Sequence, residues 1–479
     1  MSKKLAINLS YYTLGQFLSQ ALAFLLLPIY INQLSSSDYG IVASLMAFAT
    51  FLNAIMQYGF SPTIMRYYYE FKEQPKKFNA FLSALLLFMI SCNLILAYGI
   101  IAFDHYIFGF LTPSIDISIF IYYLIGYSVA FTFPLLNFSL FRVEGKAKKY
   151  FFYNLVQFFI SFGMIYFFIV VQNEGALGKV KGEFWARIPL FVLSFYLYNK
   201  YFTLKGLKLE YLRSALNFGI PLMFQALLWW ALYRLDFFLI VRELGNAELG
   251  LYNVGFQISF VLITIGISIS LGWTPHFFSI AEENKTPKLY GGLLGNYFMF
   301  ISLVSIVIYI LSYPVLFYIG GDKYLDVYAF LEWLLIGAIF QSSYFLVHQP
   351  IQYAKKTWSI PIVLAIGIVI GFSIEYFLIK KLGLVGVSIV KALTFMTVFS
   401  ATFLIGQKHY RIALSKKKIL ISLLILILNF AAGSILDFSL SSFVIKGSLL
   451  LMSLLSLWFL LPFFTQEEKE FIKEKLRLR

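Results

Sequence analysis

The chain has 479 residues, of which 60% are hydrophobic and 13% are charged, and its formal net charge is +15. Its mean hydropathy of +0.80 lies far above that of soluble domains and leaves no water-soluble domain of useful size. The single cysteine, Cys92, excludes a disulfide framework. The composition predicts an all-α integral membrane protein that crosses the bilayer many times.

Apolar stretches long enough to cross a bilayer follow one another along the sequence, and we predict about 14 transmembrane helices. The first six lie near Leu9–Ile31, Tyr39–Phe60, Phe78–Phe103, Ile117–Phe141, Tyr150–Val171 and Phe184–Tyr201. The next six lie near Ser214–Val241, Leu249–Pro275, Gly291–Ile319, Val327–Pro350, Ser359–Ile379 and Leu384–Gly406. The last two lie near Ile419–Asp437 and Phe443–Phe463.

The basic residues predict the orientation, because cytoplasmic loops carry an excess of Lys and Arg. With the N-terminus inside, the inner segments hold about 28 basic residues and the outer loops about seven. Both termini are therefore expected in the cytoplasm. The exceptions are four lysines on loops predicted to be external, Lys179, Lys181, Lys380 and Lys381. Topology and anionic lipid heads account for the net charge, so we expect no nucleic acid as a partner.

A short turn after the first predicted helix returns in the second half of the chain. Its landmarks Leu34, Asp38 and Gly40 recur 210 positions later as Leu244, Glu248 and Gly250. A lysine pair recurs at an offset of 207, as Lys148 and Lys149 against Lys355 and Lys356. A glycine pair recurs at 208, as Gly175 and Gly178 against Gly383 and Gly386. Three landmarks in the same order at nearly the same offset indicate a duplication.

The duplication predicts two six-helix bundles, residues 1–204 and 205–407, followed by two additional helices and a cytoplasmic tail in residues 408–479. Because six is an even number, both bundles have the same orientation. Parallel repeats of this kind enclose a central cavity, and rocking them exposes that cavity to each side of the membrane in turn. The pattern predicts an alternating-access transporter.

Charged residues inside predicted helices are candidates for a polar path, because a charge that faces lipid costs at least about 2.5–3.5 kcal/mol. We expect Arg234, Asp236 and Lys391 to line a cavity rather than to form structural ion pairs. Arg234 and Asp236 lie two positions apart, so they point to different faces of one helix and cannot pair within it. Glu332 and Glu375 fit either role. Asp236, Glu332 and Glu375 are the candidate ion-coupling residues.

Other candidates have a structural alternative. Arg66 and Arg142 lie near inner helix ends, where they contact substrate or simply set topology. Arg187 is a candidate for the wet interior, with outward snorkelling from a shorter span as its alternative. Trp230 and Tyr233 are candidates for stacking on a sugar, although an interfacial aromatic belt is the default interpretation.

The sequence contains no phosphate-binding loop and no zinc-protease signature, and its histidines lack metal-ligand spacing. We therefore predict a transporter rather than an enzyme, with no catalytic residue, no metal and no cofactor. Energy for transport would come from an ion gradient or from removal of the substrate.

Four segments carry a family resemblance: "LSYYTLGQFLSQALAFLLLPIYINQLSSSDYGIVA", "QYGFSPTIMRYYYE", "LFRVEGKAKKY" and "WALYRLDFFLIVRELGNAELGLYNV". The chain resembles the polysaccharide repeat-unit (O-antigen type) flippases of the multidrug/oligosaccharidyl-lipid/polysaccharide exporter superfamily. The shared landmarks are the repeated L-x-x-x-[DE]-x-G turn, Gly59 followed by Arg66, and Asp236 late in the seventh helix. Lys391 departs from the pattern, since the family more often has a small or hydroxylated residue there.

The resemblance implies a carrier that moves undecaprenyl-pyrophosphate-linked oligosaccharide from the inner to the outer leaflet of the bacterial plasma membrane, for O-antigen and lipopolysaccharide biosynthesis. The implied partners are that lipid-linked oligosaccharide, membrane lipids, a polysaccharide polymerase and a chain-length regulator. Arg234, Lys391, Arg66 and Arg142 would attract the anionic head group. The candidate ion-coupling carboxylates would exchange protons or pair with these cations.

Three alternatives stay open. A multidrug or cation efflux carrier of the same superfamily would share the fold but usually has twelve helices. A lipid-linked cell-wall precursor flippase is closer in chemistry. A membrane glycosyltransferase or polysaccharide polymerase would carry a large external loop or an acidic catalytic motif, and the first external loop offers only Asp38.

Overall fold

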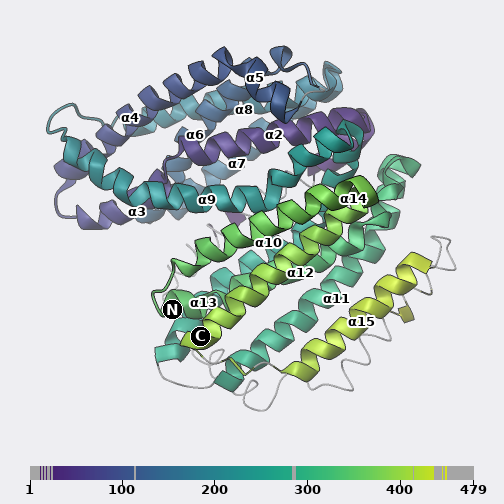
Figure 1. The fold of residues 1–479 in the computed structure, drawn as a ribbon. Helices are drawn as coiled ribbons and strands as arrows, with labels where there is room; N and C mark the ends of the chain where they lie inside the picture. Colours follow the sequence, from purple (N-terminus) through teal and green to yellow (C-terminus); the bar gives the residue numbers. More distant parts are fainter. Residues whose placement is uncertain are drawn as a thin grey trace. The chain divides into compact units, whose positions relative to one another are not determined.

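The computed structural model describes residues 25–112, 115–282, 287–410, 412–413 and 415–435, with a few single positions between 11 and 22 and between 445 and 449. Every regular element in these ranges is a helix, so the all-α membrane fold is confirmed (Figure 1). Eight helices of the described ranges are long and apolar enough to cross a membrane, or nine if one bent pair forms a single span. About half of the predicted first helix, most of the predicted last helix and the whole C-terminal tail lie outside the described residues.

The chain divides into two compact units, Met1–Gly250 and Leu251–Arg479, which we call the first and second unit. The units are defined by how densely their residues contact one another. The repeat boundary between residues 204 and 205 stays a prediction.

The first unit is a bundle of helices. Its elements are α2 (Ser36–Met56), α3 (Phe60–Glu70), α4 (Pro75–Ala102), α5 (Asp104–Leu111), η1 (Ile117–Ile119), α6 (Ile121–Val143), α7 (Ala147–Tyr166), the π-helical η2 (Phe167–Val171), α8 (Gly175–Tyr198) and α9 (Leu209–Glu243). Helix α6 packs against α2, α3 and α8, and α9 packs along α2. Phe60, Phe81, Met89 and Phe133 are at most 1% exposed and form part of the core between these helices.

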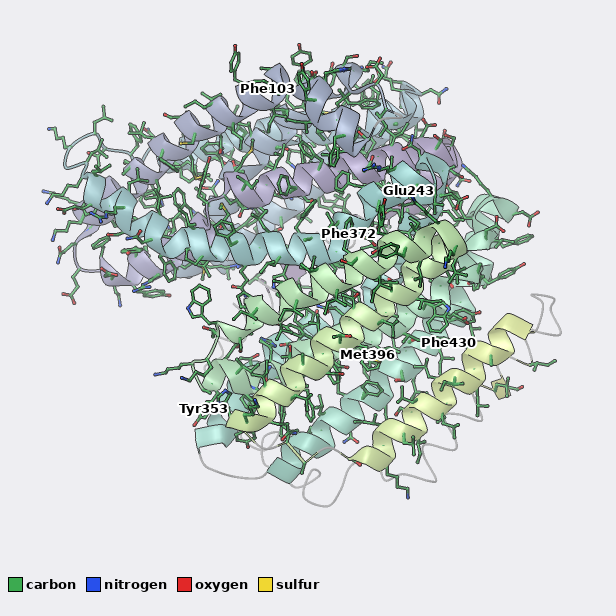
Figure 2. The ribbon with its side chains drawn as sticks, in the orientation of Figure 1. Phe103, Glu243, Tyr353, Phe372, Met396 and Phe430 are labelled. Atoms are coloured by element: carbon green, nitrogen blue, oxygen red, sulfur yellow. The ribbon has the colours of Figure 1, made fainter. Side chains whose placement is uncertain are left out.

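The second unit is also a bundle of helices. Its elements are α10 (Asn246–Glu282), which begins in the last residues of the first unit, α11 (Pro287–Gly320), η3 (Gly321–Ala329), α12 (Leu331–Val347), α13 (Gln349–Tyr353), α14 (Ser359–His409) and α15 (Lys416–Ile435). Helix α12 packs along α14, and α15 packs along α11. Phe430 of α15, labelled in Figure 2, packs against Tyr309 of α11 with ring centroids 5.0 Å apart and ring planes tilted by 51°.

The repeated turn has a local explanation in its first copy. The Ser35 hydroxyl accepts a hydrogen bond from the Asp38 backbone N–H at 2.9 Å, and the Asp38 carboxylate accepts one from the Ser35 backbone N–H at 3.3 Å. This capping box satisfies two backbone donors at the start of α2 that have no partner within the helix. Asp38 is therefore accounted for by helix capping.

The two copies of the turn also touch each other. A Cβ atom on Gly40 would lie 1.7 Å from the Asn246 carbonyl oxygen, and one on Gly250 would lie 2.0 Å from the Ser36 carbonyl oxygen. Ser36 and Asn246 are themselves 210 positions apart, so the contact is reciprocal. Backbones can approach this closely only where both helices carry glycine.

The glycine pair that recurs at an offset of 208 marks two equivalent helical hairpins. Gly175, the first residue of α8, has φ +57°, and Gly383, at the break inside α14, has φ +55°. These left-handed conformations favour glycine because a Cβ atom is strained there. The predicted helices Ser359–Ile379 and Leu384–Gly406 are thus the two limbs of α14 on either side of Gly383.

Candidate functional site

Helix α8 carries three buried charges on one face. Lys179, Glu183 and Arg187 follow one another at i, i+4 spacing and are 6–8% exposed. The Lys179 ammonium lies 2.6 Å from Glu183 Oε1, and Arg187 Nη2 lies 3.5 Å from Glu183 Oε2. The shorter contact binds the carboxylate mainly to Lys179. Arg187 also lies over the ring of Phe131, 4.9 Å from its centroid.

The structure corrects one expectation here and decides between two others. Lys179 lies in a helix and not on an external loop, because α8 begins at Gly175, nine residues before the predicted start at Phe184. Arg187 is buried, which favours its predicted interior placement over an outward snorkel. Both cations are therefore inside a longer helix. The signal that sequence reasoning missed is the K-x-x-x-E-x-x-x-R spacing, which places one carboxylate between two cations on a single helical face.

A cavity of about 410 Å³ opens beside Arg187 within the first unit. Its lining residues come mainly from α6, α7 and α8: Leu22, Ser61, Phe131, Pro134, Leu135, Phe138, Ser139, Arg142, Tyr150, Asn154, Gln157, Phe158 and Arg187. The polar members are two guanidinium groups, three hydroxyls and two amides. Cavities of about 300–1,000 Å³ with a few convergent polar groups are typical of small-ligand sites.

The two arginines occupy different parts of this cavity. Arg142 is exposed, and its Nη2 donates to the Tyr150 hydroxyl at 3.0 Å. Arg187 is buried, and its Nε has no hydrogen-bond partner among the described residues. The same is true of Gln157 Oε1. An unsatisfied buried donor costs about 1–3 kcal/mol, more if charged, so the cavity is built to hold something polar.

The candidate residues on α9 have diverse surroundings. Trp230 donates its indole N–H to the Ala47 carbonyl of α2 at 2.8 Å, and its ring packs on Phe51. Tyr233 stacks on Trp229. The Arg234 guanidinium lies over Phe237, 4.7 Å from the ring centroid.

Asp236 is 2% exposed, whereas Arg234 is half-buried, as expected for positions on different faces of α9. Arg66 lies on α3, exposed, with its guanidinium over Phe218 of α9 at 4.5 Å. Arg142 alone of the predicted site residues lines the cavity. Whether Trp230 and Tyr233 bind a sugar stays a prediction.

In the second unit, Glu375 and Lys391 are each 5% exposed and lie on opposite limbs of α14. A Cβ atom on Gly371 would lie 2.3 Å from Thr394 Oγ1, which sets the pairing of the two limbs. Glu375 lies one turn after Gly371 and Lys391 about one turn before Thr394, so the two charges are at the same level of the hairpin. Glu332 is half-buried in the first turn of α12.

The fold is that of multi-pass membrane transporters. The chain is similar to lipid II flippase MurJ in an inward closed conformation, with a TM-score of 0.75 and 14% identity over 94% of this chain and 98% of that one. It is also similar to an inward-facing multidrug resistance MATE family transporter of the MOP superfamily, with a TM-score of 0.61 and 16% identity over 85% of this chain and 94% of that one. These likenesses show the fold.

Residues 5–281, more than half of the chain, match the family described as Polysaccharide biosynthesis protein, and the chain belongs to this family. It is also 23% identical over 360 residues to a protein of the Lsg locus of Haemophilus influenzae, which covers 72% of this chain and 84% of that protein.

Proposed function

We propose that the protein is a flippase for lipid-linked oligosaccharides. It moves undecaprenyl-pyrophosphate-linked repeat units from the inner to the outer leaflet of the bacterial plasma membrane by ion-coupled alternating access, with both termini in the cytoplasm. The observation that carries the proposal is a polysaccharide-biosynthesis family sequence on a transporter fold. The products it serves would be surface polysaccharides such as O-antigen.

The charged residues of the chain suit the transport of this substrate. A pyrophosphate-linked glycan needs a polar, cationic path through the membrane, whereas its polyprenyl tail can stay in lipid. We propose that four cations attract the anionic head group: Arg234, Lys391, Arg66 and Arg142. Asp236, Glu332 and Glu375 are proposed to exchange ions or to pair with these cations during transport.

The double variant Arg234→Gln with Lys391→Gln tests the cationic path. We expect loss of surface glycan in a strain that depends on this gene, with the variant still present as folded protein in the membrane. The matched control is Arg213→Gln with Lys381→Gln, which removes two exposed cations from the same chain. Normal glycan export by the double variant would contradict the proposed role of Arg234 and Lys391.

Export itself is tested with purified wild-type protein in proteoliposomes that contain a fluorescent lipid-linked oligosaccharide. Transbilayer movement that depends on the protein supports the proposal. Lack of movement with this substrate, under an imposed proton or sodium gradient, would refute it.

The likeness to lipid II flippase MurJ favours one second candidate, a flippase for lipid-linked cell-wall precursors. The shared chemistry is a polyprenyl pyrophosphate that carries sugars. Complementation separates the two: restored growth of a strain depleted of its cell-wall precursor flippase would favour the second candidate, whereas restored surface polysaccharide alone would favour the first.

A further inference from the structure

The cavity of the first unit carries more positive charge than the protein neutralises. Lys179 and Arg187 share one carboxylate, Glu183, which lies closer to Lys179. Among the described residues, no carboxylate lies within salt-bridge distance of Arg142, which donates instead to the Tyr150 hydroxyl. Two positive charges are therefore left over, one at the buried wall of the cavity and one at its mouth.

The duplication indicates that α8 does not need these charges in order to fold. At the offset of 208, Lys179 and Arg187 correspond to Val387 and Phe395, which are 0% and 2% exposed in the second limb of α14. The equivalent helix thus packs with apolar side chains at both positions. Because apolar residues often replace buried ion pairs at no loss of stability, the charges of α8 point to a ligand.

We propose that this cavity binds an anion with at least two negative charges, either phosphate or pyrophosphate. Two guanidinium groups on different helices supply planar, forked donors, the geometry that suits phosphate oxygens. Two uncompensated positive charges match two negative ones. The hydroxyls of Ser61, Ser139 and Tyr150 add donors around the same space. The anion site rests on this geometry alone, and only the assignment of its ligand to a lipid-linked glycan rests on the proposed function.

Glu183 acts in this site as a weak competitor of the ligand for Arg187. Its carboxylate is bound to Lys179 at 2.6 Å and competes only weakly for Arg187 at 3.5 Å, so the Arg187 guanidinium stays available to the ligand. Removing the carboxylate and removing the guanidinium should then have opposite effects on affinity. A purely structural role for the three residues predicts a loss of affinity in both cases.

The test is a titration of the full-length protein in nanodiscs of neutral phosphatidylcholine with inorganic phosphate and with pyrophosphate, followed by calorimetry. We expect one site per chain that prefers pyrophosphate. Arg187→Gln should weaken its affinity at least about tenfold, the effect of losing one charge-assisted hydrogen-bonding group. Arg142→Gln should weaken it less, because Arg142 is exposed to water. Glu183→Gln should strengthen it.

The matched control is Arg213→Gln, an exposed arginine outside the cavity lining. Arg187→Lys, which keeps the charge, guards against a folding defect and should retain part of the affinity. Equal affinity in the wild type and in Arg187→Gln, or an equal loss in Arg213→Gln, would overturn the site. Weaker binding in Glu183→Gln would overturn the competing role of Glu183.

Competition in the same nanodiscs shows which molecule supplies the phosphate group that the cavity binds. Displacement of pyrophosphate by undecaprenyl pyrophosphate, but not by phosphatidylglycerol, assigns the site to the substrate head. Displacement by phosphatidylglycerol assigns it to a phospholipid. The outcomes are separable from those of the proposed function: unchanged affinity in Arg187→Gln refutes the anion site whatever the export result, and absent export by the wild type refutes the flippase without affecting the binding data.

Discussion

Replacement of Gly40 by alanine should disrupt the contact between the two copies of the repeated turn. The new Cβ would lie 1.7 Å from the Asn246 carbonyl oxygen, whereas ordinary contact begins at 3.4 Å. The two backbones must therefore separate by 3.4 − 1.7 = 1.7 Å. Overpacking against side chains costs about 1–3 kcal/mol. Because the obstacle here is backbone at the start of a helix, we expect a loss of at least about 3 kcal/mol.

The measurement is the apparent melting temperature of the purified protein in detergent, together with its folded yield. Gly99→Ala is the matched control, since Gly99 lies inside α4 with no atom within 4 Å of the new Cβ. That control should be neutral or slightly stabilising, because alanine favours a helix by about 1 kcal/mol over glycine. Gly250→Ala should resemble Gly40→Ala, and the double variant should cost less than the sum because the first substitution already separates the helices. Equal melting temperatures for Gly40→Ala and Gly99→Ala would refute the close contact.

Two further predictions concern polar contacts of the first unit. Burial alone would raise the pKa of the Glu144 carboxyl, but hydrogen bonds from Lys146 and Tyr201 and the charge of Lys200 outweigh it and lower the pKa. A carboxyl whose pKa is lower in the folded state stabilises the protein above its unfolded pKa, and this stability is lost as the pH falls through its folded pKa. Below about pH 4.5, the melting temperature should therefore fall more steeply for the wild type than for Glu144→Gln. Parallel curves would contradict this. Trp230→Phe removes the hydrogen bond to Ala47 and should cost about 1 kcal/mol in thermal unfolding. Trp185→Phe, at a residue that is 45% exposed, should cost less, and equal losses would exclude that bond as a source of stability.

Hydropathy and the repeat offsets predicted the fold class well, because both depend on features that leave a trace in the chain itself. Bilayer thickness fixes the length of apolar stretches, and a duplication fixes the spacing of its landmarks. The similar φ angles of Gly175 and Gly383, +57° and +55°, show that such landmarks can mark the same left-handed conformation in both halves.

The candidate site was harder to predict, because hydropathy treats a charged residue as a break in a helix. The predicted start of the sixth helix therefore moved past Lys179 and Glu183 to Phe184, and the burial of Arg187 was missed. Periodicity shows which residues share a helical face, but it does not show which faces meet. The convergence of Arg142 and Arg187 on one cavity depends on the packing of α6, α7 and α8, which no single segment of sequence records.

The predicted duplication places Glu183 of α8 and Lys391 of α14 at equivalent positions, where both are buried and their charges are opposite. A chimera built from two first halves would gain a second Glu183 and lose Lys391, and a chimera of two second halves would do the reverse. Such chimeras would therefore change the balance of buried charge even where their helices match in length.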